Sequence, residues 1–209
     1  ITIGSAGNAI DFGNLSGTYR EGAGCSNGTR GVFNVGGPGA DTVNTMEFIT
    51  IATTGNTTDY GDLFYAVGNA GGTSNGTRGI FGGGAGAAYT NIIQYITITH
   101  TGNAAEFGDL TQGRLGTGSV GSSTRGLISS GYAQPANANV ATIDFVTIAN
   151  TSNATTFGDS TQGRHELGAS SSETRAIFGG GTSPSLVDTI DFVTIATAGD
   201  ASDFGNLTQ

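Results

Sequence analysis

Two short glycine-rich stretches match the G-x-S-x-G pattern that surrounds the nucleophilic serine of many hydrolases. They are residues 24–28 (GCSNG) and 72–76 (GTSNG). That chemistry needs a histidine base and a sharp strand-to-helix turn that holds the serine hydroxyl out of the sheet. Neither stretch leads into a helical pattern, and both fall at the same position of a repeat between predicted strands. We therefore interpret both as turns and expect no catalytic serine.

Histidine and cysteine are the other side chains that could act as bases, nucleophiles or metal ligands. The chain has two histidines, His100 and His165, and one cysteine, Cys25. The histidines fall at different positions of the repeat, so they predict no symmetric site. Cys25 has no partner at a metal-ligand spacing, and a single cysteine cannot form an internal disulfide. We expect surface histidines, a buried cysteine and no metal centre.

Acidic side chains recur in pairs around one aromatic position of the repeat: Asp59 and Asp62, Glu106 and Asp109, Asp200 and Asp203. Calcium takes oxygen ligands of this kind. However, no EF-hand or nonapeptide calcium pattern surrounds the pairs. We expect instead that the Asp or Asn after each aromatic residue caps a turn by accepting nearby backbone N–H groups. The sequence thus predicts no cofactor.

All seven basic residues are arginines, and four of them follow a threonine at a regular spacing: Arg30, Arg78, Arg125 and Arg175. One arginine per unit among several acids favours a structural bidentate pair with a carboxylate over a substrate clamp. Arg114 lacks a counterpart near Val67 in the preceding unit. We therefore expect Arg125 to matter more for stability than Arg114.

Composition excludes several classes of function. Sixteen acids against seven arginines give a net charge of −9, whereas binding nucleic acid needs a basic surface. No apolar run approaches the roughly 18 residues of a membrane-spanning helix, so we expect no membrane insertion. Glycine is 38 of 209 residues, which disfavours helices. The chain begins at Ile1 instead of a methionine, which is compatible with a processed or longer parent chain.

An internal repeat is the strongest signal in the sequence. An aromatic residue followed by glycine recurs with spacings of 47 to 50, at Phe12, Tyr60, Phe107, Phe157 and Phe204. The Thr-Arg pairs recur in step with it. The chain is thus one repeat domain with units at about 1–48, 49–95, 96–145 and 146–192 and a partial unit at 193–209.

Each unit reads as short strands separated by turns. One predicted strand lies at 46–51, 93–98, 143–148 and 190–195 and carries bulky residues on both faces, which indicates cover on both sides. A second strand runs into an aromatic-Gly-Asp turn, and the Thr-Arg pair opens a third. A period of 47 to 50 residues with about four strands predicts an all-β fold of the β-propeller type. An open β-solenoid or fibre is the alternative.

The two ends of the chain repeat one another. Residues 193–209 match residues 1–17 nearly position for position. A closed ring of four units would have no place for this duplicate. We therefore expect five or more blade positions, with a fifth that is incomplete in this sequence and lacks roughly 30 residues. These would come from outside the given sequence or from a neighbouring subunit.

The order of glycines, aromatic residues and arginine resembles the kelch repeat. The resemblance rests on Gly82–Gly84, Tyr95, Phe107 and Arg114, and again on Gly179–Gly181, Phe192 and Phe204. The chain has no tryptophan, which the kelch unit places where Phe107 stands. The strings TIATTGNTTDYGDL and SNGTRGIFGGG are also similar to tandem repeats in structural proteins of marine and cyanobacterial phages, which are described as tail-fibre or kelch-like virion proteins.

This resemblance implies a non-enzymatic virion appendage that presents loops to host-surface glycans or proteins. The candidate ligand residues are those of the variable loops: Phe64, Tyr65, Tyr89, Tyr132, Gln134, Arg164 and His165. The expected partners are other virion or filament subunits in a homo-oligomer, and the expected location is a virion or another extracellular surface. A filament-forming cell-surface protein and a sugar-active propeller enzyme are the alternative functions.

Overall fold

The computed structural model describes residues 6–37 and 42–208. These residues form strands joined by turns and loops, and the described part of the chain contains no helix. The strands build four antiparallel sheets of four strands each and one small three-stranded sheet. The strands of every four-stranded sheet pair in chain order, although two further short strands separate the second and third strands of the third sheet along the chain. Each sheet crosses one of the expected unit boundaries near residues 48, 95, 145 and 192. The expected all-β repeat architecture with four strands per unit is therefore confirmed.

The four large sheets are numbered here 1 to 4 along the chain. Sheet 1 contains β1 (Ala23–Ser26), β2 (Arg30–Asn34), β3 (Thr45–Thr50) and β4 (Thr58–Asp62). Sheet 2 contains β5 (Gly71–Ser74), β6 (Arg78–Gly82), β7 (Ile92–Thr97) and β8 (Ala105–Asp109). Sheet 3 contains β10 (Gly118–Gly121), β11 (Arg125–Ser129), β14 (Thr142–Thr147) and β15 (Thr155–Asp159). Sheet 4 contains β16 (Gly168–Ser171), β17 (Arg175–Gly179), β18 (Thr189–Thr194) and β19 (Ser202–Asn206). The small sheet contains β9 (Arg114–Leu115), β12 (Tyr132–Ala133) and β13 (Ala138–Asn139).

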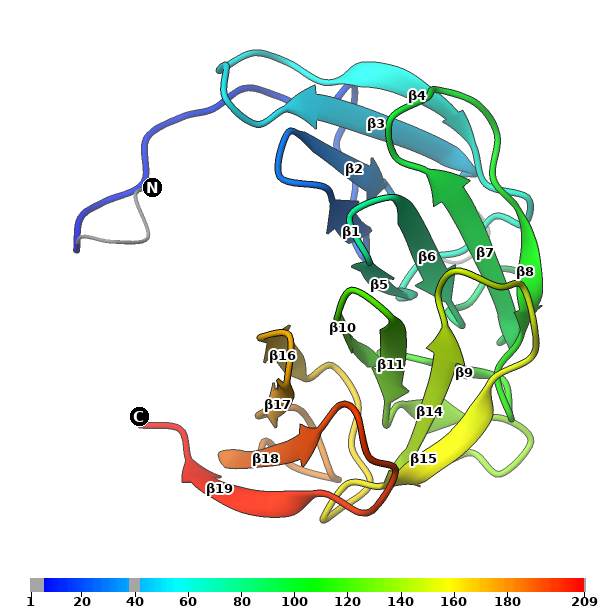
Figure 1. Ribbon diagram of the computed structural model, residues 1–209, viewed down its shortest axis with the longest axis vertical. Helices are drawn as coiled ribbons and strands as arrows, with labels where there is room; N and C mark the ends of the chain where they lie inside the picture. Colours follow the sequence, from blue (N-terminus) through cyan, green and yellow to red (C-terminus); the bar gives the residue numbers. More distant parts are fainter. Residues whose placement is uncertain (1–5, 38–41, 209) are drawn as a thin grey trace.

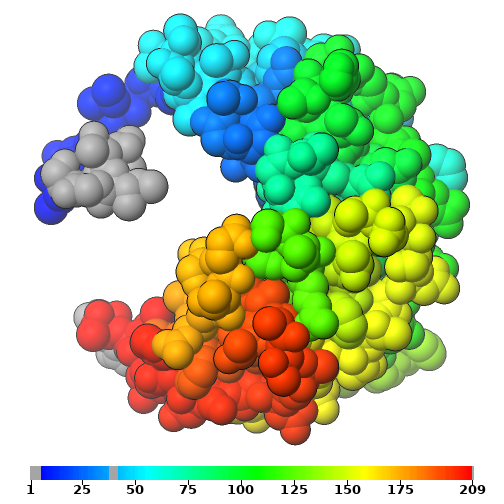
Figure 2. All heavy atoms as spheres, in the orientation of Figure 1, coloured from blue at the N-terminus to red at the C-terminus, as the bar shows by residue number. Residues whose placement is uncertain are grey.

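The sheets stand side by side around a common centre, like the sectors of an incomplete disc (Figure 1). The first strand of each sheet lies nearest the centre, where β5 touches both β1 and β10, and β10 also touches β16. The fourth strand of each sheet lies at the outer rim. The arc is open on one side, and both ends of the described chain lie at this opening (Figures 1 and 2).

The aromatic-Gly-Asp motif lies within the fourth strand, so the expected turn at this position is wrong. In every sheet the register between the third and fourth strands shifts at this point, as at Ile93/Gln94 in sheet 2. Glycine is required at Gly108 because its φ is +152° and a Cβ there would overlap the backbone of the next sheet. The capping carboxylate is the acid before the aromatic residue, since Asp59 accepts the N–H of Gly61 at 3.2 Å.

The core lies between neighbouring sheets and is filled by one aromatic pair per unit. The aromatic residue of the fourth strand meets an aromatic residue of the third strand edge-on, with ring centroids 5.9 to 6.2 Å apart: Phe48–Tyr60, Tyr95–Phe107, Phe145–Phe157 and Phe192–Phe204. Tyr60, Phe107 and Phe157 are only 2 to 3% exposed because the next sheet covers them. The expectation that both faces of the third strands are covered holds for sheets 2 and 3, where successive residues such as Ile93 and Gln94 are both at most 1% exposed, whereas sheet 1 has a neighbouring sheet on one side only.

The Thr-Arg arginines stack on aromatic rings, so the expected pairing with carboxylates is wrong. The guanidinium carbons lie 4.3 to 4.8 Å from the ring centroids of the third strands, in the pairs Arg30–Phe48, Arg78–Tyr95, Arg125–Phe145 and Arg175–Phe192. Arg125 also donates to the carbonyl oxygen of Ile195 in the next sheet at 2.9 Å. A cation over a ring face is stabilised by about 0.5–1 kcal/mol where it is partly exposed. Each of these arginines thus packs on a ring of its own sheet, and the bond from Arg125 to Ile195 also links two sheets.

Each junction between sheets is made by the fourth strand and a loop of the following sheet. At the first junction, the carbonyl oxygen of Asp62 accepts the N–H of Ala104 at 2.8 Å. The N–H of Asp62 donates to the side-chain oxygen of Asn103 at 3.0 Å. The same two bonds recur for Asp109 with Asn153 and Ala154, and for Asp159 with Asp200 and Ala201. We call this three-residue contact the clasp.

Candidate functional site

The seven candidate ligand residues all lie in segments at one edge of the sheets. Antiparallel order brings the end of each second strand, the start of the third and the connection to the next sheet to the same edge. We call this edge the loop face. It carries the β4–β5 connection (Phe64, Tyr65), the β6–β7 loop (Tyr89), the β11–β14 loop (Tyr132, Gln134) and the β15–β16 connection (Arg164, His165).

Three of these residues form a continuous row of rings. The ring centroids of Tyr89 and Tyr132 lie 6.2 Å apart with an interplanar angle of 73°. The rings of Tyr132 and His165 lie 5.7 Å apart at 67°. We call Tyr89, Tyr132 and His165 the aromatic row. It joins the loops of sheets 2 and 3 to the connection that leads into sheet 4, and all three side chains are half-buried.

The middle of the aromatic row is held by the small sheet. Tyr132 lies on β12, which pairs with β9 on one side and β13 on the other. The phenol of Tyr132 donates to the carbonyl oxygen of Asn137 at 2.8 Å. The same pairing recurs as isolated bridges between Gly68, Ala85 and Tyr89 and between His165, Thr182 and Leu186, and the longer β11–β14 loop extends it here to short strands. The small sheet gives Tyr132 a fixed position on what is otherwise a loop.

The two ends of the row are also anchored. His165 forms backbone bonds with Thr182 in both directions, and its Nδ1 lies 2.8 Å from the side-chain oxygen of Asn139. The Asn139 amide in turn donates to the Thr182 carbonyl oxygen at 3.0 Å. Tyr89 is bridged to Ala85 within its own loop. The row is therefore a preformed surface of ring edges and faces with an amide beside it.

The remaining candidates lie outside the row. Phe64 is 58% exposed, and the backbone of Tyr65 is fixed by Gln94, whose amide bonds its N–H at 2.6 Å and its carbonyl oxygen at 2.9 Å. Gln134 is exposed, next to the row in the β11–β14 loop. Sequence reasoning named these residues from their loop positions, and it did not reveal which of them meet.

Arg164 is a buried structural residue, so its assignment to a ligand loop is wrong. Its side chain is 0% exposed and lies 2.9 Å from the equally buried carboxylate of Asp191. The same guanidinium donates to the carbonyl oxygen of Phe178 at 3.1 Å. Arg164 thus fixes the connection that carries His165.

Arg114 occupies the matching position one unit earlier. It lies 3.0 Å from the carboxylate of Asp144, with both side chains 0% exposed. Burial lowers the pKa of Arg114, and the Asp144 carboxylate opposes this shift. Arg114 is fully buried in an ion pair and Arg125 only half-buried, which removes the reason for expecting Arg125 to matter more for stability than Arg114. A carboxylate at the third residue of the third strand was the available sequence signal.

The nucleophile-like motifs are used structurally. Ser26 and Ser74 lie at the ends of β1 and β5, and the Asn-Gly pairs after them make the turns. The hydroxyl of Ser74 donates to the carbonyl oxygen of Ser26 across the sheet junction at 2.6 Å. Cys25 is buried, and this burial raises its pKa to about 12. Over residues 6–37 and 42–208, no three His, Cys, Asp or Glu side chains gather closely enough to hold a metal ion.

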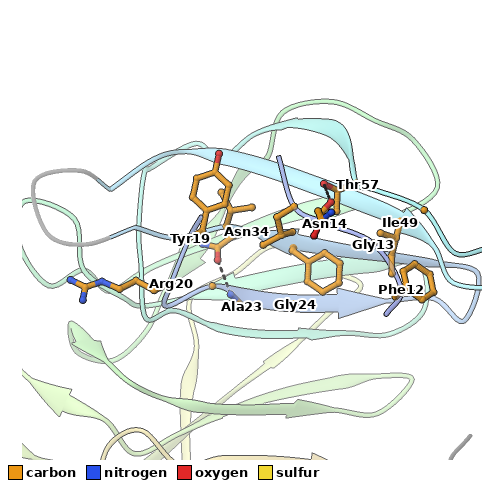
Figure 3. A pocket seen from close by; sticks show the side chains of 15 residues that line it. Phe12, Gly13, Asn14, Tyr19, Arg20, Ala23, Gly24, Asn34, Ile49 and Thr57 are labelled. Carbon is orange, nitrogen blue, oxygen red and sulfur yellow. Dashed lines mark hydrogen bonds between the residues drawn. The ribbon is translucent and has the colours of Figure 1, made fainter. Parts of the chain in front are cut away.

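A groove lies at the N-terminal side of the opening. Its volume is about 480 Å³, and its lining includes Phe12, Tyr19, Gly24, Phe33 and Ile49 (Figure 3). Figure 3 shows Phe12 and Ile49 at one end of the groove and Tyr19 at the other, while Arg20 points away from it. The groove is mostly apolar and lies between the N-terminal segment and sheet 1.

No protein-family model matches the chain, and no curated protein is significantly similar to it. Among the described residues there is no helix of the length and apolarity needed to cross a bilayer.

Proposed function

We propose that the four sheets are blades of a kelch-like β-propeller with five or more blade positions. Three observations support this interpretation. The sheets are arranged radially with first strands inward and fourth strands outward, neighbouring sheets pack face to face around buried aromatic residues, and the clasp repeats at each junction. Such a scaffold holds the loops of successive units at fixed separations.

We further propose that the loop face binds glycan chains without chemical turnover. The observation that carries this proposal is the aromatic row, in which Tyr89, Tyr132 and His165 from three loop segments lie ring to ring. Aromatic rings cover the apolar C–H faces of sugars, while amides bond their hydroxyl groups. The exposed amide of Gln134, two residues after Tyr132, could supply such a group.

The charge of the chain narrows the ligand class. With a net charge of −9, the protein repels polyanions at a distance. Neutral glycans therefore suit the row better than sulfated or sialylated ones. Shallow contacts of this kind bind weakly one at a time, and repeated presentation in an assembly raises the avidity.

The proposed setting is a virion appendage or another extracellular surface, where such a module would contact the host. This part of the proposal rests on the resemblance of the repeat strings to phage structural proteins. The partners would be further subunits of the same appendage and the glycans of the host surface. A purified particle probed with an antibody against this chain would test the location.

The glycan proposal is tested by titration of neutral oligosaccharides selected on an array. Tyr132→Ala should weaken binding about tenfold, because it removes the central ring of the row. Leu186→Ala is the matched control, since Leu186 is an apolar side chain of the β17–β18 loop and is 86% exposed. Equal loss of binding in both variants, or none in Tyr132→Ala, would refute the assignment.

Turnover is tested in the same samples. If the module only binds, the oligosaccharide should be recovered intact after prolonged incubation, with no new reducing ends. Release of shorter products by the purified chain would instead favour the sugar-active enzyme.

A further inference from the structure

The N-terminal segment of the described chain behaves as the fourth strand of a blade that the chain does not complete. Residues 10–14 carry the same motif as β4, and they bind sheet 1 as β4 binds sheet 2. The carbonyl oxygen of Phe12 accepts the N–H of Gly55 at 2.8 Å. The matching bond from Gly102 to Tyr60 is 2.7 Å.

The clasp is also complete at this point. The N–H of Asn14 donates to the side-chain oxygen of Asn56 at 3.0 Å, and the Asn14 carbonyl oxygen accepts the N–H of Thr57 at 3.0 Å. A Cβ on Gly13 would overlap the Gly55 carbonyl oxygen. A Cβ on the corresponding glycine of β4, β8 or β15 would likewise overlap a carbonyl oxygen of the following sheet. Residues 10–14 thus make the contacts of a fourth strand with sheet 1, but the first three strands of their own blade are not among the described residues.

The groove at the N-terminal side is the space that the inner strands of that blade would fill. Leu15 is 40% exposed, whereas the matching Leu63 and Leu110 are 3% exposed. Ile10 is 79% exposed. Figure 3 shows the groove running beside Phe12, over the face of sheet 1 that a preceding sheet would cover.

On the opposite side of the opening, sheet 4 exposes residues that are buried in the other sheets. Phe204 on β19 is 55% exposed and Leu207 is 47% exposed. At the other junctions, Tyr60, Phe107 and Phe157 occupy the position of Phe204 and are 2 to 3% exposed. All four residues of β16 are exposed, while the residues of β5 and β10 are buried or half-buried. Sheet 4 therefore ends in a bare junction face.

We propose that one further three-stranded segment of this repeat, with the pattern of residues 163–192, fills the opening and takes residues 10–14 as its fourth strand. This inference rests on the proposed propeller. Its occupant is identified by continuity with the interface already present between sheets 1 to 4. The third strand of the segment would pair with residues 10–14, and its other face would cover Phe204.

On its other side, the completed blade would form a clasp with sheet 4. Asn8 holds the position of Asn56, Asn103, Asn153 and Asp200 in the other units. In the closed arrangement, the Asn8 side chain accepts the N–H of Asn206, and the N–H of Ala9 donates to the Asn206 carbonyl oxygen. Both ends of the arc thus carry the matching halves of one junction.

A second whole copy of the chain fits the opening less well. Sheet 4 of the copy would bring β19, which competes with residues 10–14 for the one outer position. Two chains of net charge −9 would also repel each other. A free three-stranded segment meets neither obstacle.

The test is an extended chain in which a second copy of residues 163–192 precedes Ile1, because Ile1 matches Val193 in the repeat. The matched control carries the same added residues in scrambled order. Both chains, and the unextended protein, carry Phe204→Cys as a thiol reporter. Cys25 contributes little background, since its thiol is buried and its pKa is raised to about 12. The ordered extension should slow labelling of the reporter about tenfold, while the scrambled one leaves the rate unchanged.

Asn8→Ala provides a second readout. Asn8 is exposed in the unextended protein, so the substitution should leave its Tm unchanged. In the ordered extended chain it should lower the Tm by about 2–4 °C, because one closing hydrogen bond is lost. A substitution that acts only after closure cannot be explained by local packing in the free N-terminal segment.

Three results would overturn the closure. One is unchanged labelling in the ordered extended chain. Another is an added segment that protects Leu15 from labelling, as Leu15→Cys, but leaves position 204 reactive; that outcome means more than five positions and leaves the propeller proposal standing. The third is a stable dimer of the unextended chain in which position 204 is already protected, which would make a second copy the occupant. Loss of glycan binding has no bearing on any of these readouts.

Discussion

Arg114 and Asp144 lie 3.0 Å apart with neither side chain exposed, and together they tie the connection leaving sheet 2 to the third strand of sheet 3. Asp144 also accepts the N–H of Thr111 at 2.9 Å. The same strand position carries a clamping polar residue in every sheet: Glu47, Gln94, Asp144 and Asp191. One position per unit thus fixes the incoming connection, although the residue types differ.

Removing this clamp should destabilise the protein strongly. Arg114→Ala leaves the Asp144 carboxylate buried without its cation, which costs about 3–5 kcal/mol. Arg125→Ala removes a partly exposed ring stack and one hydrogen bond, for which we expect about 1–2 kcal/mol. Urea unfolding followed by circular dichroism gives both values, and a larger effect for Arg125→Ala would contradict this ranking.

Replacing both partners tests whether the loss comes from the orphaned charge. In the double variant Arg114→Met and Asp144→Leu, no buried charge remains, so most of the stability should return. If the double variant is as unstable as Arg114→Ala, the loss of stability comes from the missing hydrogen bonds and packing of the pair and not from an orphaned charge.

The fourth-strand glycines should be intolerant wherever another sheet follows. In Gly108→Val, the new side chain overlaps the Ser152 carbonyl oxygen, and we expect a loss of about 1–3 kcal/mol from overpacking. Gly205→Val is the control, because the same motif position at the free end of sheet 4 has nothing within 4 Å. Both glycines have positive φ values, so backbone strain is shared. The difference between the Tm values of the two variants therefore measures the effect of the overlap at the sheet junction.

Acid should release the N-terminal segment. Burial alone would raise the pKa of Glu47, but hydrogen bonds from Ser16 and Thr57 outweigh it and lower the pKa. A carboxyl whose pKa is lowered by folding contributes stability above its unfolded pKa of about 4.3, and this stability disappears as the pH falls through the folded value. The protection of the Thr57 N–H against hydrogen exchange, relative to an unfolded chain at the same pH, should fall below about pH 4. In Glu47→Gln this acid dependence should be absent, and its persistence would implicate another group.

Chelators should leave the fold intact. Asp59 and Asp203 each accept the N–H of the glycine two residues further on, at 3.2 and 3.0 Å, which gives these carboxylates a structural role without a cation. Addition of EDTA should therefore leave the Tm unchanged. A large drop that calcium reverses would show that the acids are ligands after all.

The thiol of Cys25 should report global unfolding. Because its pKa is raised to about 12 by burial, alkylation at pH 8 requires exposure of the side chain. Labelling should follow the urea unfolding curve. Rapid labelling under native conditions would mean that the junction between sheets 1 and 2, where the Cys25 sulfur faces Gly79, opens locally.

The repeat alone was enough to predict the all-β class and the placing of the second and third strands. Spacing reports which positions recur, and recurring bulky residues such as Ile80 and Ile93 had to be core. The role of the glycine in the aromatic-Gly-Asp motif was misread as a turn, because Gly-Asp in isolation indicates a turn and only the neighbouring sheet reveals the close approach.

The arginines show where sequence reasoning fails. Arg30 and its equivalents recur, which suggested a buried pair, but recurrence measures a shared place in the unit and not burial. Arg114 and Arg164 occur in only two units, and their burial follows from Asp144 and Asp191 on strands distant in the sequence. The aromatic row was equally hidden, since Tyr89, Tyr132 and His165 come from different repeat positions and meet only in three dimensions.

The clasp has a consequence for how this gene can change. It is formed by backbone groups and one side-chain oxygen, so it accepts any neighbour that carries the same short loop. Duplication or loss of a whole unit preserves every junction, whereas insertion of a fraction of a unit separates a strand from the loop it binds. Spacings of 47 to 50 residues are therefore the step size for recombination in this protein. Loops outside the clasp can differ in length without disturbing a junction, as the longer β11–β14 loop does.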